Sequence, residues 1–452
     1  MYDILIKNGQ YPDFDTNQLV KADIAIQDGK IAAIGQIDGD AKKVIDAKGR
    51  VVSPGFVDIH MHEENFETEG HEYFIANLMV QMGVTTALGG NCGDTRQNLK
   101  DFLAVLDELG GVPMNYMMMS GYNSFRKQLD INRYDPSAPE QVETMIGRVK
   151  EELAQGAVGV SFGLEYDPGI TYDEVMTVLN AIPEDDLLVS MHFREDSMAG
   201  VDEMVNFALE SGKKFQISHL SSCAAIGFMD QALKTINEAS KKNPKLDYDT
   251  YPYAAFSTRI GSAVFDEGWR EKWNKSYEHI FMPAGKYANQ FCTEETYWEM
   301  RNNEPDLYVV AMTMNEDEIT AAIANPDSGM VASDGTVKAH AGHPRAAGTF
   351  PRVLGKYVRE EKALSLIDAL RKMTLIPARR LDLVNKGRIA EGLDADITIF
   401  DPETIADGAT FETLAIKPVG IDAVIVNGQV AVEYGELINA RAGKFIPGPY
   451  VK

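Results

Sequence analysis

Apolar residues in the middle of the chain form short runs that alternate with segments of helical periodicity. The runs lie at 55–62, 84–88, 116–120, 158–164, 187–192, 215–219, 246–250 and 330–334. Apolar residues recur at helical spacing at 71–82, 140–154, 202–209, 231–239 and 316–324. This alternation favours parallel strands joined by crossover helices. We therefore predict an α/β protein built on a (β/α)8 TIM-like barrel.

The two ends of the chain have a different pattern, with short apolar runs separated by tight turns. The runs lie at 4–6, 24–26, 31–34, 395–400 and 423–426. Asp28-Gly29 predicts a hairpin turn, and the same Asn-Gly dipeptide occurs near both ends of the chain, as Asn8-Gly9 and Asn427-Gly428. Each end is too small to have a core of its own, so we expect both to build one small β-sandwich. The predicted domains are the first sandwich part, the barrel and the second sandwich part, at 1–52, 53–384 and 385–452.

One long segment of the predicted barrel fits neither pattern. Residues 265–308 are rich in aromatic side chains but have no clear period. We expect this segment to be an insertion that covers a functional site.

Composition limits the classes of partner. The chain has 452 residues, 44% of them hydrophobic, which suffices for a large enzyme domain with a smaller appendage. A formal net charge of −25 opposes binding to nucleic acid or to an anionic membrane. The sequence has no apolar run long enough to span a bilayer and no pattern of a signal peptide at Met1. Three cysteines are too few for a disulfide framework, so we expect a cytoplasmic protein with reduced thiols.

Candidate metal ligands follow the predicted strands. A period of two places His60 and His62 on one face of the first strand, although such a pair could also bond only to neighbouring backbone. The other candidates at strand ends are Cys92, His192, His219 and Asp334. The carboxyl ends of barrel strands meet on one rim, so these side chains are expected to converge there. A thiolate with imidazoles suits zinc, which would activate water.

The ordered set of motifs resembles the amidohydrolase superfamily and, within it, the N-acyl-D-amino-acid deacylase (D-aminoacylase) family. The resemblance extends over almost the whole chain. Its motifs are Pro54 to His62, Gly90 to Gly93, Gly163 to Gly169, Met191 to Glu195, Ile217 to His219, Tyr251 to Tyr253, Ala332 to Gly335, and His343 to Phe350. Gly392 to Ile397 is similar to the segment in which amidohydrolases return to their sandwich.

The resemblance implies roles for the candidate ligands. Cys92, His192 and His219 would hold one tight zinc ion, and His60 and His62 would line a second, weak site. The fourth strand lacks the lysine or glutamate that bridges two metals in other amidohydrolases, so Cys92 is expected to replace that bridge.

The resemblance also assigns the proton transfer. Asp334 would take a proton from water and return it to the leaving amine. The alternatives are that Cys92 is a small buried apolar residue and that Asp334 caps a helix.

Substrate contacts are also implied. Arg345 could bind a free α-carboxylate through two parallel hydrogen bonds, with Tyr166, Tyr253 and Ser257 as further partners. Many family members have a lysine two residues after the strand-six histidine, where this chain has Ser221. The loss of that cation favours neutral or hydrophobic D-residues, although Arg259 could compensate for it.

The sequence is compatible with three functions. The first is zinc-dependent hydrolysis of N-acyl-D-amino acids to a carboxylate and a free D-amino acid. The second is hydrolysis of cyclic amides, as in hydantoinases and dihydroorotases. The third is a barrel without catalysis that acts as a binding scaffold. The sequence does not fix the acyl group, the number of metal ions or whether the chain forms a homo-oligomer.

Overall fold

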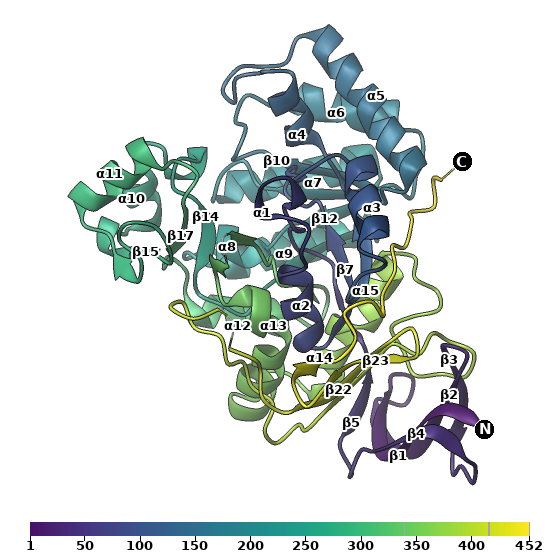
Figure 1. The fold of residues 1–452 in the computed structure, drawn as a ribbon. Coiled ribbons are helices and arrows are strands. Elements are labelled where there is room, and N and C mark those ends of the chain that lie inside the picture. Colours follow the sequence, from purple (N-terminus) through teal and green to yellow (C-terminus); the bar gives the residue numbers. More distant parts are fainter. Residues whose placement is uncertain (339, 415, 452) are drawn as a thin grey trace.

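The computed structural model describes residues 1–338, 340–414 and 416–451 and has a mixed α/β fold (Figure 1). Two parallel sheets occupy the centre. The first has the order β6-β7-β8, with β6 (Phe56–Asp58), β7 (Val84–Gly89) and β8 (Asn115–Met118). The second has the order β18-β13-β12-β11-β10-β9, with β9 (Ser120–Gly121), β10 (Gly159–Gly163), β11 (Leu188–His192), β12 (Lys214–Ile217), β13 (Leu246–Thr250) and β18 (Met330–Val331). These strands coincide with the predicted apolar runs, which confirms the α/β class.

The two parallel sheets contact each other at both of their ends. At one end only Met119 separates β8 from β9, and the Val158 amide donates to the Met118 carbonyl at 2.9 Å. At the other end Met61 forms a parallel bridge with Gly335, and the Asp334 amide donates to the His60 carbonyl at 2.7 Å. The segments that follow β6 and β18 therefore lie side by side.

Helices connect the central strands and cover them. The longer ones are α2 (Ile75–Gln81), α3 (Leu99–Glu108), α4 (Tyr122–Gln128), α5 (Pro139–Gln155), α6 (Tyr172–Ala181), α7 (Met198–Ser211), α9 (Met229–Ser240), α12 (Glu316–Ala324), α13 (Arg345–Arg352) and α14 (Leu366–Met373). Shorter ones are α1 (Phe66–Glu69), α8 (Leu220–Ala224), α15 (Leu375–Arg380) and the π-helix η3 (Val353–Glu360). Within the described ranges, no helix has the length and apolarity that crossing a membrane requires.

Two predicted helices begin at other residues in the structure, and a helix cap explains one of these differences. Predicted helix 202–209 begins earlier, at Met198, because the Ser197 side chain accepts a hydrogen bond from the Gly200 amide. Predicted helix 71–82 begins only at Ile75. Helices α3 and α6, which we did not predict, have side-chain caps at Asn98 and Thr171.

Both ends of the chain contribute to one nine-stranded sheet, at the lower right of Figure 1. The first strands are β1 (Tyr2–Asp13), β2 (Gln18–Gln27), β3 (Lys30–Gly35), β4 (Ala41–Asp46) and β5 (Val51–Pro54), and the last are β21 (Ile397–Phe400), β22 (Ile421–Val426), β23 (Gln429–Glu433) and β24 (Glu436–Leu437). The two groups join where β5 pairs antiparallel with β21, with Pro54 opposite Ile397. Ile6, Ile26 and Ile425 are among the residues of their shared apolar core.

A separate lobe, defined here as residues 256–311, projects at the left of Figure 1. Its antiparallel sheet has the order β14-β17-β15-β16, with β14 (Phe256–Arg259), β15 (Ile280–Met282), β16 (Gln290–Phe291) and β17 (Tyr308–Ala311). Its helices are η1 (Ala263–Phe265), α10 (Trp269–Trp273), η2 (Tyr277–His279) and α11 (Glu294–Asn303). Phe265, Trp269, Trp273 and Tyr297 form the centre of its own apolar core. The aromatic-rich segment without a period thus forms most of a small unit. A short hairpin, β19 (Val337–Lys338) with β20 (Ala341–Gly342), follows β18.

Candidate metal centre and active site

The structure brings the six predicted ligand side chains together at the carboxyl ends of the central strands. The Cys92 sulfur lies 3.3 Å from Nε2 of His60 and 3.3 Å from Nε2 of His219. Nδ1 of His192 lies 2.9 Å from Nε2 of His219. Two groups of potential ligand atoms, each within 4.8 Å of one another, share Cys92: Cys92, His192 and His219 in one, and His60, His62, Cys92 and Asp334 in the other.

Three of the four histidines have one ring nitrogen anchored and the other directed into the cluster. Nε2 of His192 faces Glu165 Oε2 at 3.2 Å, and Nδ1 of His60 faces Asp249 Oδ2 at 3.3 Å. Nδ1 of His219 lies 2.6 Å from the Ser222 hydroxyl, which donates its own proton to the His219 carbonyl. An anchored N–H fixes the tautomer and leaves the other nitrogen free to bind a metal ion. The donor set therefore fits zinc.

His62 differs from the other three histidines. Its Nε2 lies 3.3 Å from Asp334 Oδ1, but its buried Nδ1 has no hydrogen-bond partner among the described residues. An imidazole whose second nitrogen is not anchored is a less well-oriented ligand. The group that contains His62 is accordingly the weaker candidate site.

Cys92 is set up to be a thiolate. Burial raises the pKa of its thiol, but the imidazoles of His60 and His219 outweigh that effect and hold the pKa well below its usual value. Cys92 is also buried, as a small apolar residue would be, yet its sulfur faces imidazole nitrogens. Cys92, Cys223 and Cys292 are all free thiols, as predicted.

Three of the candidate residues have left-handed backbone conformations. The φ angles are 54° at Cys92, 31° at His219 and 47° at Asp334. Non-glycine residues adopt positive φ only at an energetic cost, and such positions are common in active sites. Each of the three follows a strand closely, so the left-handed residue turns the chain away while its side chain stays over the sheet end.

Asp334 is held as a charged carboxylate. Its Oδ2 lies 2.9 Å from Nη1 of Arg345, and its Oδ1 lies 3.5 Å from Nε2 of His60. Burial raises the pKa of this carboxyl group, but Arg345 and the neighbouring histidines hold the pKa well below its ordinary value. The helix-cap alternative is wrong, because a short hairpin follows Asp334 and the next helix is capped at Pro344.

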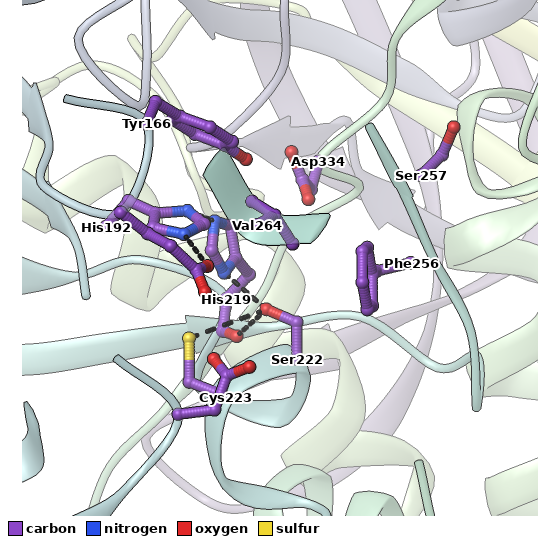
Figure 2. A pocket seen from close by; sticks show the side chains of 11 residues that line it. Tyr166, His192, His219, Ser222, Cys223, Phe256, Ser257, Val264 and Asp334 are labelled. Carbon is purple, nitrogen blue, oxygen red and sulfur yellow. Dashed lines mark hydrogen bonds and ion pairs between the residues drawn. The ribbon is translucent and has the colours of Figure 1, made fainter. Parts of the chain in front are cut away.

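A cavity of about 570 Å³ opens beside the metal-ligand cluster. Its wall includes His62, Cys92, Asp334 and three of the predicted substrate contacts, Tyr166, Ser257 and Arg259. Gly261, Ser262, Pro305 and Asp306 of the lobe also line it. A narrower recess shares Tyr166, Ser257 and Asp334 with this cavity. Tyr166, His192, His219 and Asp334 are among the residues that line the recess (Figure 2). Of the predicted insertion 265–308, Pro305, Asp306 and Tyr308 thus line the cavity, and its role as a cover of the site stays a prediction.

Two predicted substrate contacts lie elsewhere. Tyr253 is not among the residues that line the cavity, and its hydroxyl contacts Asp407 Oδ2 at 3.3 Å, so the structure does not support its predicted role. Arg345 is only 1% exposed and lies behind Asp334, and its part in carboxylate binding stays a prediction. Tyr251, which the prediction did not single out, stacks on the Arg345 guanidinium at 4.6 Å.

Three residues that contact the candidate ligands are not predicted from the sequence, namely Glu165, Ser222 and Asp249. Glu165 lies in the quoted segment Gly163 to Gly169, so a signal was present for it. Ser222 follows His219 by three residues, the separation expected across one helical turn. For Asp249, on a strand that has no ligand, we find no signal in the sequence alone.

Comparison with known proteins agrees with this geometry. Two models, each described as the Amidohydrolase family, match residues 190–432 and 51–247. The D-aminoacylase of Alcaligenes xylosoxydans xylosoxydans is 27% identical, over 98% of this chain and 97% of its own. The N-acyl-D-glutamate deacylase of the same organism is 29% identical, over 94% and 93%.

A solved structure extends the likeness to three dimensions. The N-acyl-D-glutamate deacylase of Bordetella bronchiseptica, complexed with zinc and a phosphonate inhibitor that mimics the tetrahedral intermediate, superimposes with a TM-score of 0.87 at 26% identity. The alignment covers 99% of this chain and 100% of that protein. With one family model spanning more than half of its residues and a metal-ligand cluster at its strand ends, the chain belongs to the amidohydrolase family.

Proposed function

We propose that this protein is a zinc-dependent N-acyl-D-amino-acid deacylase, which hydrolyses the amide bond and releases a carboxylate and a free D-amino acid. The observation that carries the proposal is the convergence of Cys92, His192 and His219 beside Asp334, at the wall of the cavity. Full-length relatives with deacylase activity in their names support the substrate class.

In this proposal Cys92, His192 and His219 hold one tight zinc ion. His60, His62 and Asp334 complete a second, weaker site around the same thiolate. Bound zinc would supply a nucleophilic water at neutral pH and polarise the amide carbonyl. The anchoring of three imidazoles by Glu165, Asp249 and Ser222 supports this assignment.

Asp334 moves the proton. Because Arg345 and the histidines keep it ionised, it can accept a proton from the attacking water. The same carboxyl group then returns that proton to the nitrogen of the leaving amine, which must be protonated to depart. One residue thus serves both steps.

Tyr166 orients the substrate from the wall of the cavity. Burial, with the nearby charges of Cys92 and Asp334, raises the pKa of its phenol well above the ordinary value. A neutral phenol donates a hydrogen bond, and Tyr166 lies at the edge of both hollows, where a substrate carbonyl would sit. Arg345 and Ser257 remain the proposed partners of the free α-carboxylate, and Arg259, at the cavity wall, is the cation that could pair with an acidic side chain.

The architecture that supports this site is proposed to be a (β/α)8 barrel over residues 53–384, with a β-sandwich formed by 1–52 and 385–452. The hydrogen bond from Val158 to Met118, where only Met119 separates β8 from β9, and the bridge from Met61 to Gly335 support closure of the barrel. The single sheet shared by both chain ends supports the second domain.

A direct assay separates the candidate functions. The zinc-loaded protein is offered N-acetyl-D-methionine, N-acetyl-L-methionine and dihydrouracil. We expect turnover of the D-acyl substrate alone. Turnover of dihydrouracil alone would support the cyclic-amide alternative. If the zinc-bound protein hydrolyses no member of a broad library of N-acyl-D-amino acids, the result would support a binding scaffold.

A further inference from the structure

The lobe reaches the metal centre through one lysine. Helix α10 carries Lys272, whose ammonium nitrogen lies 2.9 Å from Glu165 Oε1 and 3.1 Å from Asp196 Oδ2. The other oxygen of Glu165 faces Nε2 of His192 at 3.2 Å. A chain of three side chains therefore runs from the lobe to a proposed zinc ligand.

We propose that Lys272 is a positioning residue that couples docking of the lobe to retention of zinc. The inference rests on the proposed function, because it takes His192 to be a zinc ligand. Lys272 holds one oxygen of the Glu165 carboxylate, so that the other oxygen faces His192. Glu165 then requires the proton of His192 to be on Nε2, which leaves the lone pair of Nδ1 directed toward Cys92 and His219.

The surroundings of Lys272 explain why a cation is needed there. Glu165 and Asp196 are both buried, with 7% and 8% of their surfaces exposed, and both contact the same ammonium group. Without that cation the two carboxylates would face each other in a poorly hydrated space, where like charges are costly. Glu165 would then turn away from Asp196, and its other oxygen would no longer be held against His192.

The neighbouring tryptophan fixes the same helix. Trp273 donates from Nε1 to Asp196 Oδ2 at 2.8 Å, and its ring lies in the lobe core with Phe265 and Trp269. Lys272 and Trp273 thus place α10 against the loops that follow β10 and β11. Because equilibrium coupling is reciprocal, a lobe that strengthens zinc binding must itself be held more firmly when zinc is bound.

The first test compares zinc affinities by competition with a chelator, using the full chain without substrate. Lys272→Met removes the charge, and we expect it to weaken zinc binding by about tenfold or more. Lys272→Arg keeps the charge and should stay within about threefold of wild type, as a retained cation still pairs with both carboxylates. Glu165→Gln, a variant outside the lobe, should show a loss like that of Lys272→Met.

Lys286→Met is the matched control, because Lys286 forms an exposed ion pair with Glu299 in the same lobe, at 2.6 Å. We expect it to bind zinc as the wild type does. Wild-type affinity in Lys272→Met, or an equal loss in Lys286→Met, would overturn the coupling while leaving the proposed zinc site intact. Absence of zinc binding in the wild type would instead overturn the proposed function, and the coupling with it.

A second measurement tests the coupling first in the wild type and then in Lys272→Met. Amide hydrogen exchange of residues 269–273 is followed in the wild type with and without zinc. Slower exchange with zinc is expected from reciprocity, and unchanged exchange in these residues would refute the coupling. In Lys272→Met the zinc-dependent slowing should be lost.

Discussion

At the residue scale, Asp334 joins the charge of Arg345 to the metal-ligand cluster. One of its oxygens faces the guanidinium, and the other faces His60 and His62. In this position Asp334 stays ionised and lies beside the proposed metal ligands, as its proposed role as a base requires. Asp334 pairs with Arg345 and is not in the group of Cys92, His192 and His219, so its proposed role differs from that of the proposed ligands of the tight zinc ion.

Asp334→Asn is expected to lower turnover about a thousandfold, because an amide cannot shuttle the proton. The tight zinc ion should remain, since Cys92, His192 and His219 are unchanged. The check is kcat together with the zinc content of the purified variant. Loss of the tightly bound zinc along with activity would show that Asp334 acts mainly as a ligand.

Tyr308 is a second residue with an unusual environment. Burial raises the pKa of its phenol, but the guanidiniums of Arg96 and Arg259 more than offset this effect and lower the pKa to about 8. Arg96 Nη2 lies 3.1 Å from the Tyr308 hydroxyl. Since the folded protein releases this proton at lower pH than a free tyrosine does, tyrosinate should form early as pH rises.

We expect the near-ultraviolet absorbance of tyrosinate to show a step near pH 8 that corresponds to one residue. Tyr308→Phe should lack the step and keep the later rise from the other tyrosines. Tyr134→Phe, at an exposed tyrosine whose pKa is raised, is the control and should keep it. A titration of Tyr308→Phe identical to that of the wild type would contradict the assignment.

At the element scale, one carboxylate ties three strand ends together. Asp249 on β13 accepts from Nε2 of Gln216 at 3.0 Å and from the His219 amide at 2.8 Å, and it faces Nδ1 of His60 at 3.3 Å. The carboxyl ends of β6, β12 and β13 are therefore connected through a group that only accepts hydrogen bonds.

Asp249→Asn should destabilise the protein by at least about 2 kcal/mol, because its amide group would face two donors in a buried site. Urea unfolding of the zinc-free protein measures the change in the free energy of unfolding. Glu238→Gln, at an exposed position of α9, is the control and should change stability little. Equal stability of both variants would argue against Asp249 as a connecting group.

The sequence predicted the strands and helices better than the contacts between side chains. Apolar runs locate buried strands, and the ends of parallel strands meet, so His192 and His219 could be placed together without coordinates. No such rule covers Lys272, which reaches Glu165 only through the folding of the lobe. Tyr251 and Tyr253 could not be told apart, because β13 ends at Thr250 and a strand's alternation no longer applies after it.

At the scale of the whole molecule, the metal-ligand cluster draws on segments from far along the chain. Cys92, His192 and His219 come from the ends of different strands, and none of them is close in sequence to another. An ion that binds all three stabilises the folded state relative to the unfolded chain, which has no preformed site.

Zinc should therefore raise the thermal unfolding midpoint, and a chelator should lower both that midpoint and the activity. At a free zinc concentration a hundred times Kd, the expected stabilisation is about 3 kcal/mol. Cys92→Ala should lose the zinc-dependent shift, whereas Cys292→Ala, at a buried thiol in the lobe, should keep it. Scanning calorimetry with and without zinc measures both, and a full shift in Cys92→Ala would refute the ligand set.

The nine-stranded sheet has a consequence for the order of folding during synthesis. Strand β5 leaves the ribosome long before its partner β21, yet Pro54 pairs with Ile397. Until β21 to β23 emerge, β5 offers an unpaired edge to any neighbouring chain. We expect release of the nascent protein before β21 to yield aggregates. Chaperones would then be needed most after the candidate metal ligands have emerged and before β21 does.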